Sequence, residues 1–134
     1  MKNILAIFVA VCLTVMVNGQ TYTGELTTGS YTQRNARMEV RVSGSTCTLV
    51  MRHVKFAKLM PVKVDVEVKG LRCETDGANR KLKGNKIIPL NNGKPHEKYT
   101  ICDFQGTVEG VTLEFDCRMG GKKVTFKGGK AADG

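Results

Sequence analysis

Several patterns typical of helical, catalytic or metal-dependent proteins are missing from this chain of 134 residues. No stretch combines an apolar period of 3.6 residues with the length of an amphipathic helix, so hairpins are the simplest connections. There is no Cys-x-x-Cys pair and no close cysteine and histidine cluster, which argues against a zinc site. No serine lies in a nucleophile elbow, and no glycine-rich phosphate loop joins a strand to a helix.

Histidine is also scarce, and neither copy belongs to a catalytic motif. His53 falls at the end of an expected strand and His96 in a loop beside Pro95, with no acid or nucleophile tied to either by a known spacing. Most charged residues occupy the outward parity of the expected strands, as on a solvated surface. We therefore expect a protein that is not an enzyme and has no cofactor.

Aromatic residues make up only 6% of the chain, and tryptophan is absent. Phe104, Phe115 and Phe126 fall on an expected core face, so few aromatic side chains remain to stack on bases. The formal net charge is +9, but the basic residues are spread from Arg34 to Lys130. This spread favours a solvated basic surface, and we expect no nucleic-acid partner.

Only one long apolar run is present, and it lies at the start of the chain. It covers about 14 residues after Met1-Lys2-Asn3 and is followed by Val17-Asn18-Gly19. This order is typical of a secretory signal peptide, and the run is short of the ~20 residues that cross a bilayer. We predict a signal peptide over 1–19 and one domain over 20–134, secreted or periplasmic, with no integral membrane segment after cleavage. The less favoured lipoprotein alternative requires acylation of Cys12.

The segment from Cys102 to Val124 predicts a three-stranded meander. A two-residue turn at Glu109-Gly110 places apolar residues on one face, and a second turn at Gly120-Gly121 continues that face into the next strand. The expected partners are Val108 with Val111, Gly106 with Leu113, Phe104 with Phe115, Cys102 with Cys117, Val124 with Cys117, and Phe126 with Phe115.

Removal of the signal peptide leaves an even number of cysteines: Cys47, Cys73, Cys102 and Cys117. In an exported chain this indicates two disulfides, for which three connectivities are open. The predicted hairpin favours Cys102 with Cys117, which leaves Cys47 with Cys73.

Alternation and turns predict further hairpins along the chain. Turns are expected at Ser43-Gly44 and Asp76-Gly77, and a bulge at Gly70, while 27–35 is polar and turn-like. The expected strands lie near 21–27, 36–42, 45–52, 62–73, 79–88, 99–108, 111–118 and 122–127. Eight strands with local connections favour an all-β, antiparallel, up-and-down calycin-like barrel over a two-sheet sandwich, because closure removes the sheet edges.

Nearly all of the chain after residue 19 resembles the calycin-like, or lipocalin-like, β-barrel domain of secreted bacterial proteins. The resemblance is carried by TYTGEL, ARMEVRV-SGS-TCTLVMR, KFAKLMPVKVDVEVKGL, KLKGNKIIP and FQGTVEGVTLEFDCRMGGKKVTFKG. The Gly-x-Trp signature of lipocalins is absent. The resemblance implies an eight-stranded barrel outside the cytoplasm, similar in shape to proteins that hold small apolar molecules.

An eight-stranded barrel either is filled by its own side chains or holds one small ligand. The residues expected to face inward are Met38, Val40, Leu49, Met51, Val64, Val66, Phe104, Leu113, Phe115 and Phe126. They either line a cavity for a small apolar ligand or form a filled core, and any pocket would open among the loops at 27–35, 54–61 and 89–98.

A protein partner is the alternative to a small ligand. The irregular segment 55–60 mixes apolar and basic side chains, and a loop on a rigid barrel is a common contact surface in inhibitors and interaction modules. The same segment could instead fold over one end of the barrel, with Phe56 and Leu59 as its cover.

Overall fold

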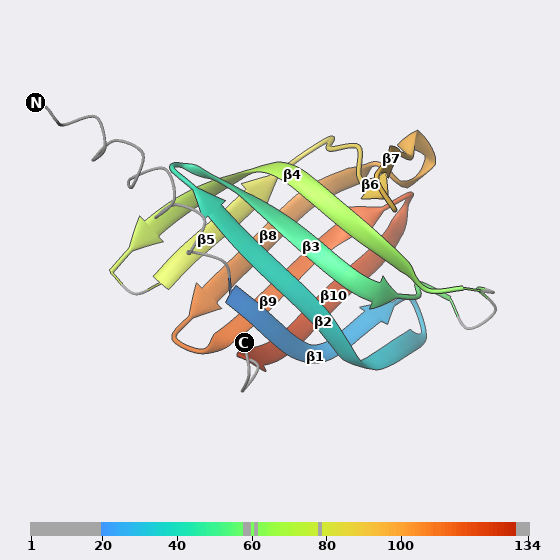
Figure 1. Ribbon diagram of the computed structural model, residues 1–134, viewed down its shortest axis with the longest axis horizontal. Coiled ribbons are helices and arrows are strands. Elements are labelled where there is room, and N and C mark those ends of the chain that lie inside the picture. The colour runs from blue at the N-terminus through green and yellow to red at the C-terminus, as the bar shows by residue number, and fades with distance from the viewer. Residues whose placement is uncertain (1–19, 58–59, 61, 78, 131–134) are drawn as a thin grey trace, which may run out of the picture.

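The computed structural model describes residues 20–57, 60, 62–77 and 79–130. It confirms an all-β protein with a closed, eight-stranded, antiparallel up-and-down barrel (Figure 1). The barrel strands are β1 (Gln20–Thr28), β2 (Tyr31–Ser43), β3 (Thr46–Val54), β4 (Val64–Asp76), β5 (Asn79–Gly84), β8 (Ile101–Glu109), β9 (Thr112–Met119) and β10 (Lys122–Lys130). The predicted signal peptide lies outside the described residues.

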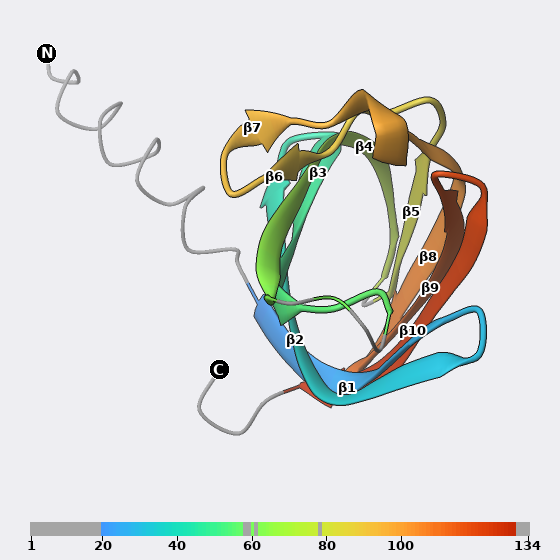
Figure 2. The ribbon, with the colours of Figure 1, turned by 90° about the vertical axis from the view of Figure 1, so that its right-hand side faces the viewer.

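Short elements lie between β5 and β8. β6 (Leu90–Asn91) and β7 (Lys94–Pro95) form a small hairpin, followed by the 3-10 helix η1 (Glu97–Tyr99). β6 also pairs with β4. Figure 2 shows the barrel strands as a ring, with this hairpin at the rim of one end. The strand expected over 79–88 is shorter than predicted, because β5 ends at Gly84. Beyond it, Ile87 forms an isolated β-bridge with Ile101.

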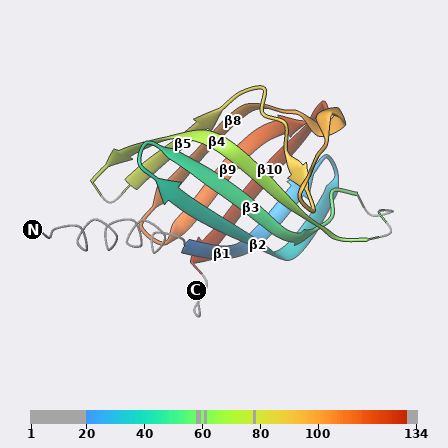
Figure 3. The ribbon, with the colours of Figure 1, turned by 45° about the horizontal axis from the view of Figure 1, so that its top comes forward.

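The barrel closes where β1 pairs with β10, and two glycines mark the contact. Gly24 lies opposite Gly128, and a Cβ atom added to either would overlap backbone of the other strand. Their missing side chains let the two strands approach closely. Figure 3 shows how closure sets β2, β3 and β4 on one wall against β8, β9 and β10 on the other.

The turns predicted at Glu109-Gly110, Ser43-Gly44 and Asp76-Gly77 are each displaced by one residue. Most apolar side chains still face inward, but Val111, predicted opposite Val108, is exposed. Val108 pairs with Leu113, Val42 with Cys47, and Cys73 with Leu82. Each turn begins with the glycine instead of ending with it, as at Gly110, which has a φ of 60°. By contrast, the predicted pairing around Gly120-Gly121 is confirmed.

A bulge at Asp103 removes Cys102 from the position expected for it. Asp103 has a φ of 53°, and the register shifts between Cys102 and Gln105. As a result Cys102 lies opposite Arg118, so its predicted pairing with Cys117 is wrong. All four described cysteines are free thiols in the structure.

Two other local predictions have opposite outcomes. The bulge predicted at Gly70 is confirmed, since this residue has a φ of 81° and the β3–β4 register shifts beside it. The polar segment 27–35 is not a loop, because β1 and β2 continue through it to a tight turn at Gly29.

Within the described ranges no helix is long and apolar enough to span a membrane.

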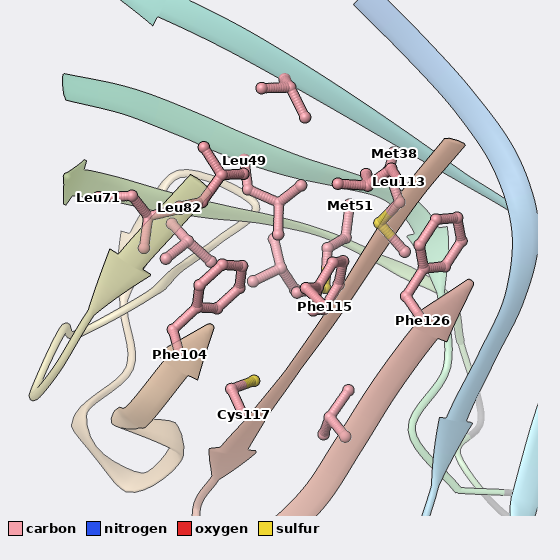
Figure 4. Close-up of a cluster of buried hydrophobic side chains, with 14 of the residues drawn as sticks. Met38, Leu49, Met51, Leu71, Leu82, Phe104, Leu113, Phe115, Cys117 and Phe126 are labelled. Atoms are coloured by element: carbon pink, nitrogen blue, oxygen red, sulfur yellow. The ribbon is translucent and has the colours of Figure 1, made fainter. Parts of the chain in front are cut away.

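The middle of the barrel holds one continuous cluster of apolar side chains (Figure 4). Within it three phenylalanine rings stack in a column. The ring centres of Phe104 and Phe115 lie 5.0 Å apart, and those of Phe115 and Phe126 lie 5.5 Å apart. Gly106 leaves room for this column, since a Cβ there would lie 3.0 Å from Cβ of Phe115. Burial of this cluster provides the main driving force for folding.

Candidate ligand pocket at one end of the barrel

A pocket of about 510 Å³ lies at the end of the barrel that carries the β6–β7 hairpin. Segments from all three loop regions predicted to surround a pocket contribute to it, together with the β9–β10 turn. Its described lining residues are Thr28, Phe56, Ala57, Met60, Val64, Asn91, His96, Lys98, Tyr99, Met119, Gly120, Lys122 and Val124. The volume falls in the usual range for small-molecule sites.

The floor of the pocket is apolar except for one hydroxyl group. Val124 and Met119 are 0% and 5% exposed, and Thr28, at the end of β1, lies opposite Val124. Thr28 is 5% exposed, and its Oγ1 is the one buried side-chain nitrogen or oxygen of the described residues without a hydrogen-bond partner. A buried hydroxyl without a partner is costly, so a ligand group that reaches this atom from the pocket would remove the cost.

One wall is formed by the chain that follows β3. Phe56 and Val64 are partly buried and pack against the core. The Phe56 backbone N–H donates to Sδ of Met60 over 3.1 Å, and the Met60 N–H donates to the Ala57 carbonyl over 3.2 Å. These bonds turn the chain so that Phe56 and Met60 both line the pocket, as expected for a segment folded over the barrel end. Leu59, the other predicted cover residue, lies outside the described residues.

The opposite wall is polar at its outer edge. The ring of Tyr99 meets that of His96 edge to face, with 4.8 Å between centres. Nδ1 of His96 lies 3.1 Å from Nδ2 of Asn91 in β6. The exposed side chains of His96, Lys98 and Lys122 form the mouth of the pocket. The pocket thus changes from apolar at its floor to polar and basic at its mouth.

Asp65, near the start of β4, connects the elements around the pocket. Its Oδ1 accepts from the backbone N–H of His53 at 2.9 Å, and its backbone N–H donates to Oδ1 of Asn92 in the β6–β7 turn at 3.0 Å. Arg52 pairs with Asp65 at 3.2 Å and with Glu39 at 3.0 Å. The hydrogen bond from His53 lowers the pKa of Asp65, and that from Arg52 lowers the pKa of Glu39.

Nine of the ten predicted lining residues lie in the central core and not around this pocket, each no more than 4% exposed. Val64 is the exception, because it is partly buried and lines the pocket. Thr28, Tyr99 and Met119 also line the pocket, although they were not predicted to do so. Period-two alternation could place Thr28 and Met119 on the inner face, but it does not show which inner positions lie at the barrel end.

Buried thiols lie deeper in the barrel. Burial, followed by the neighbouring Cys73 thiol, raises the pKa of Cys47 to about 12. Burial also raises the pKa of Cys117 to about 12, with added repulsion from Asp116. Such thiols stay protonated at neutral pH and are weak nucleophiles.

Two further hollows, each of about 440 Å³, lie on the outer wall. One includes Arg72, Lys83 and Asp103, and the other includes several carboxylates from β8 and β9. Their walls are mostly polar side chains that point away from the core. Nowhere in the described part of the chain do three or more histidine, cysteine, aspartate or glutamate side chains gather in a way that could hold a metal ion.

Comparison of the chain with protein-family models, with curated proteins and with solved structures finds no match. The barrel and its end pocket are therefore the basis for a functional proposal.

Proposed function

We propose that this protein is a non-enzymatic, calycin-like binding protein that acts outside the cytoplasm and holds a small, largely apolar ligand in the end pocket. The observation that carries the proposal is Thr28, a residue of an otherwise apolar floor whose buried Oγ1 has no partner among the described residues. Ligand sites commonly combine apolar walls with a few polar atoms that fix orientation.

The geometry favours this site over the centre of the barrel. The central side chains pack against one another, whereas the end pocket has both volume and a mouth. The pocket also joins separate segments of the chain, so a bound ligand would link β1, β4, β6, η1, β9, β10 and the segment after β3. Binding to the folded state alone would then raise stability by mass action.

Native mass spectrometry of protein purified from its own source tests the proposal. We expect an added mass that is lost on denaturation, and we expect Met119→Trp, which fills the pocket floor, to abolish it. Met51→Leu, a substitution in the central core, serves as the control and should retain the added mass. Absence of any bound mass, with no stabilisation by apolar compounds in a thermal melt, would contradict the proposal.

The denatured mass tests the export part of the proposal. A chain of residues 20–134 would support cleavage after Gly19, and a loss of four hydrogens would indicate two disulfides. Cys47 and Cys73, which lie on the adjacent strands β3 and β4, are the proposed pair for one of these disulfides. A protein partner that co-purifies without any bound small molecule would instead favour an interaction module.

A further inference from the structure

We infer that the ligand of the end pocket is a small amphipathic anion, with its apolar body on the pocket floor and a single acidic group between Lys98 and Lys122 at the mouth. This inference rests on the proposed function and adds the chemical class of the ligand. It also gives the ligand a direction, with the charged group outward.

The charged residues among the described lining of the pocket are all basic. Two lysines and one histidine line the mouth, and no described aspartate or glutamate lines the pocket. The outer hollow across β8 and β9 has the opposite character, since it contains Glu25, Glu109, Glu114 and Asp116 with a single lysine, Lys127. The end pocket therefore favours an anion by its own local charge, and not merely because the whole protein is basic.

The fold brings the two lysines to the same mouth. Lys98 lies in η1 and Lys122 begins β10, and the β9–β10 turn joins these elements through a bond from the Gly120 N–H to the Thr100 carbonyl at 3.2 Å. A Cβ at Gly120 would lie only 2.9 Å from the carbonyl oxygen of Lys98, so only glycine permits this approach.

Both ammonium groups are available to a ligand. The ion pairs of the described residues involve Arg41 and Arg52, and neither Lys98 nor Lys122 takes part in one. Nζ of Lys98 lies 5.9 Å from the ring centre of Tyr99, which holds this lysine beside a pocket wall. An acidic group at the mouth would be attracted to two cations while the apolar body of the ligand leaves water below them.

The change in polarity with depth fixes the orientation. Thr28, Met119 and Val124 are buried, whereas Lys98 and Lys122 are exposed. A charged group at the floor would lose its hydration with only one hydroxyl as compensation, which is strongly unfavourable. A charged group at the mouth keeps contact with water, and the floor hydroxyl can pair with a neutral oxygen on the buried part of the ligand.

Three probes of similar length test the inference by isothermal titration calorimetry of the full folded chain: decanoate, decan-1-ol and decylamine. We expect decanoate to bind best and decylamine worst. Lys98→Gln and Lys122→Gln should each weaken the binding of decanoate by about two- to fivefold, as expected for partly solvated charges. Neither substitution should change the affinity for decan-1-ol. Lys83→Gln, on the outer wall, is the matched control and should change the affinity for neither decanoate nor decan-1-ol.

Salt provides an independent measurement. Raising the ionic strength from about 0.01 M to about 1 M shortens the Debye length from about 30 Å to about 3 Å, so the preference for decanoate over decan-1-ol should shrink. Equal binding of the two, or a decanoate affinity unchanged in the Lys98→Gln Lys122→Gln double variant, would overturn the inference and leave the proposed function standing. Failure of all three probes to bind would overturn both.

Discussion

At the scale of single residues, Thr28 is the clearest sign of a site. Its position at the end of β1 follows from alternation, since Leu26 and Thr28 both face inward. A threonine at an inner position of an apolar barrel is unusual unless its hydroxyl has a partner, and none is present among the described residues. The residue therefore has a cost in the empty protein that a ligand could offset.

Replacing this hydroxyl should separate stability from binding. We expect Thr28→Val to raise the free energy of unfolding of the empty protein by about 1 kcal/mol, because an unpaired buried hydroxyl is replaced by a methyl group of similar size. The same change should weaken the binding of the natural ligand. Urea unfolding and native mass spectrometry measure the two effects.

Thr27→Val on the same strand is the control. The hydroxyl of Thr27 lies 2.9 Å from that of Thr32 on the exposed face, and its loss should leave ligand binding unchanged. A loss of stability in Thr28→Val would show that the Thr28 hydroxyl is paired in solution and would contradict our interpretation of the floor.

At the scale of strands and turns, the glycines explain which sequence predictions were confirmed. A turn over Glu109-Gly110 with the glycine second would need a positive φ at Glu109, which is unfavourable for a residue with a side chain. The chain instead places Gly110 first, and Val111 becomes exposed. In Gly120-Gly121 both residues can adopt positive φ, and both do, so the predicted register is confirmed there.

The pocket was predictable only in part. Its surrounding loops follow from the turn-rich segments between strands, but the hairpin of β6 and β7 and the bulge at Asp103 depend on contacts between distant segments. Asn85, for example, accepts the backbone N–H of Asp103 through its Oδ1 at 3.1 Å, a bond that alternation cannot indicate. Core residues could be identified, whereas the boundary between filled core and pocket could not.

The cluster of Glu39, Arg52 and Asp65 should make stability depend on pH. The pKa values of Glu39 and Asp65 are lowered in the folded protein, from ordinary values of 4.5 and 3.8. Their contribution is therefore present above these ordinary values and is lost as the pH falls through the lowered ones. The Asp65 side chain is 35% exposed, so solvent screening limits its contribution to the free energy of unfolding to about 1 kcal/mol or less.

Urea unfolding at about pH 7 and about pH 3 tests this expectation. Asp65→Asn keeps an oxygen that can accept the His53 N–H but loses the charge that faces Arg52. The variant should be less stable at neutral pH and should lose less stability on acidification. Glu109→Gln, at the end of β8 and outside these ion pairs, is the control. An unchanged acid response in Asp65→Asn would show that the cluster contributes nothing measurable.

At the scale of the whole molecule, closure of the barrel holds the pocket together. Thr28, at the end of β1, reaches the floor only because β1 pairs with β10 along its length, from Tyr22 with Lys130 to Thr28 with Val124. The tight contact at Gly24 and Gly128 therefore supports a site several residues away. A defect in closure should reduce both stability and ligand binding.

Gly24→Ala tests this coupling. The new Cβ would overlap the backbone of Lys127 and Gly128, which cannot move without opening the β1–β10 ladder, so we expect a loss of about 1–3 kcal/mol in the free energy of unfolding. Gly129→Ala is the matched control, because its Cβ would lie 3.8 Å from the nearest atom, the Val111 carbonyl oxygen. Hydrogen exchange should show faster exchange along β1 and β10 in Gly24→Ala, with weaker ligand binding. Protection equal in the two variants would mean that β1 and β10 do not need the close approach, and that the pocket is held by its local hydrogen bonds alone.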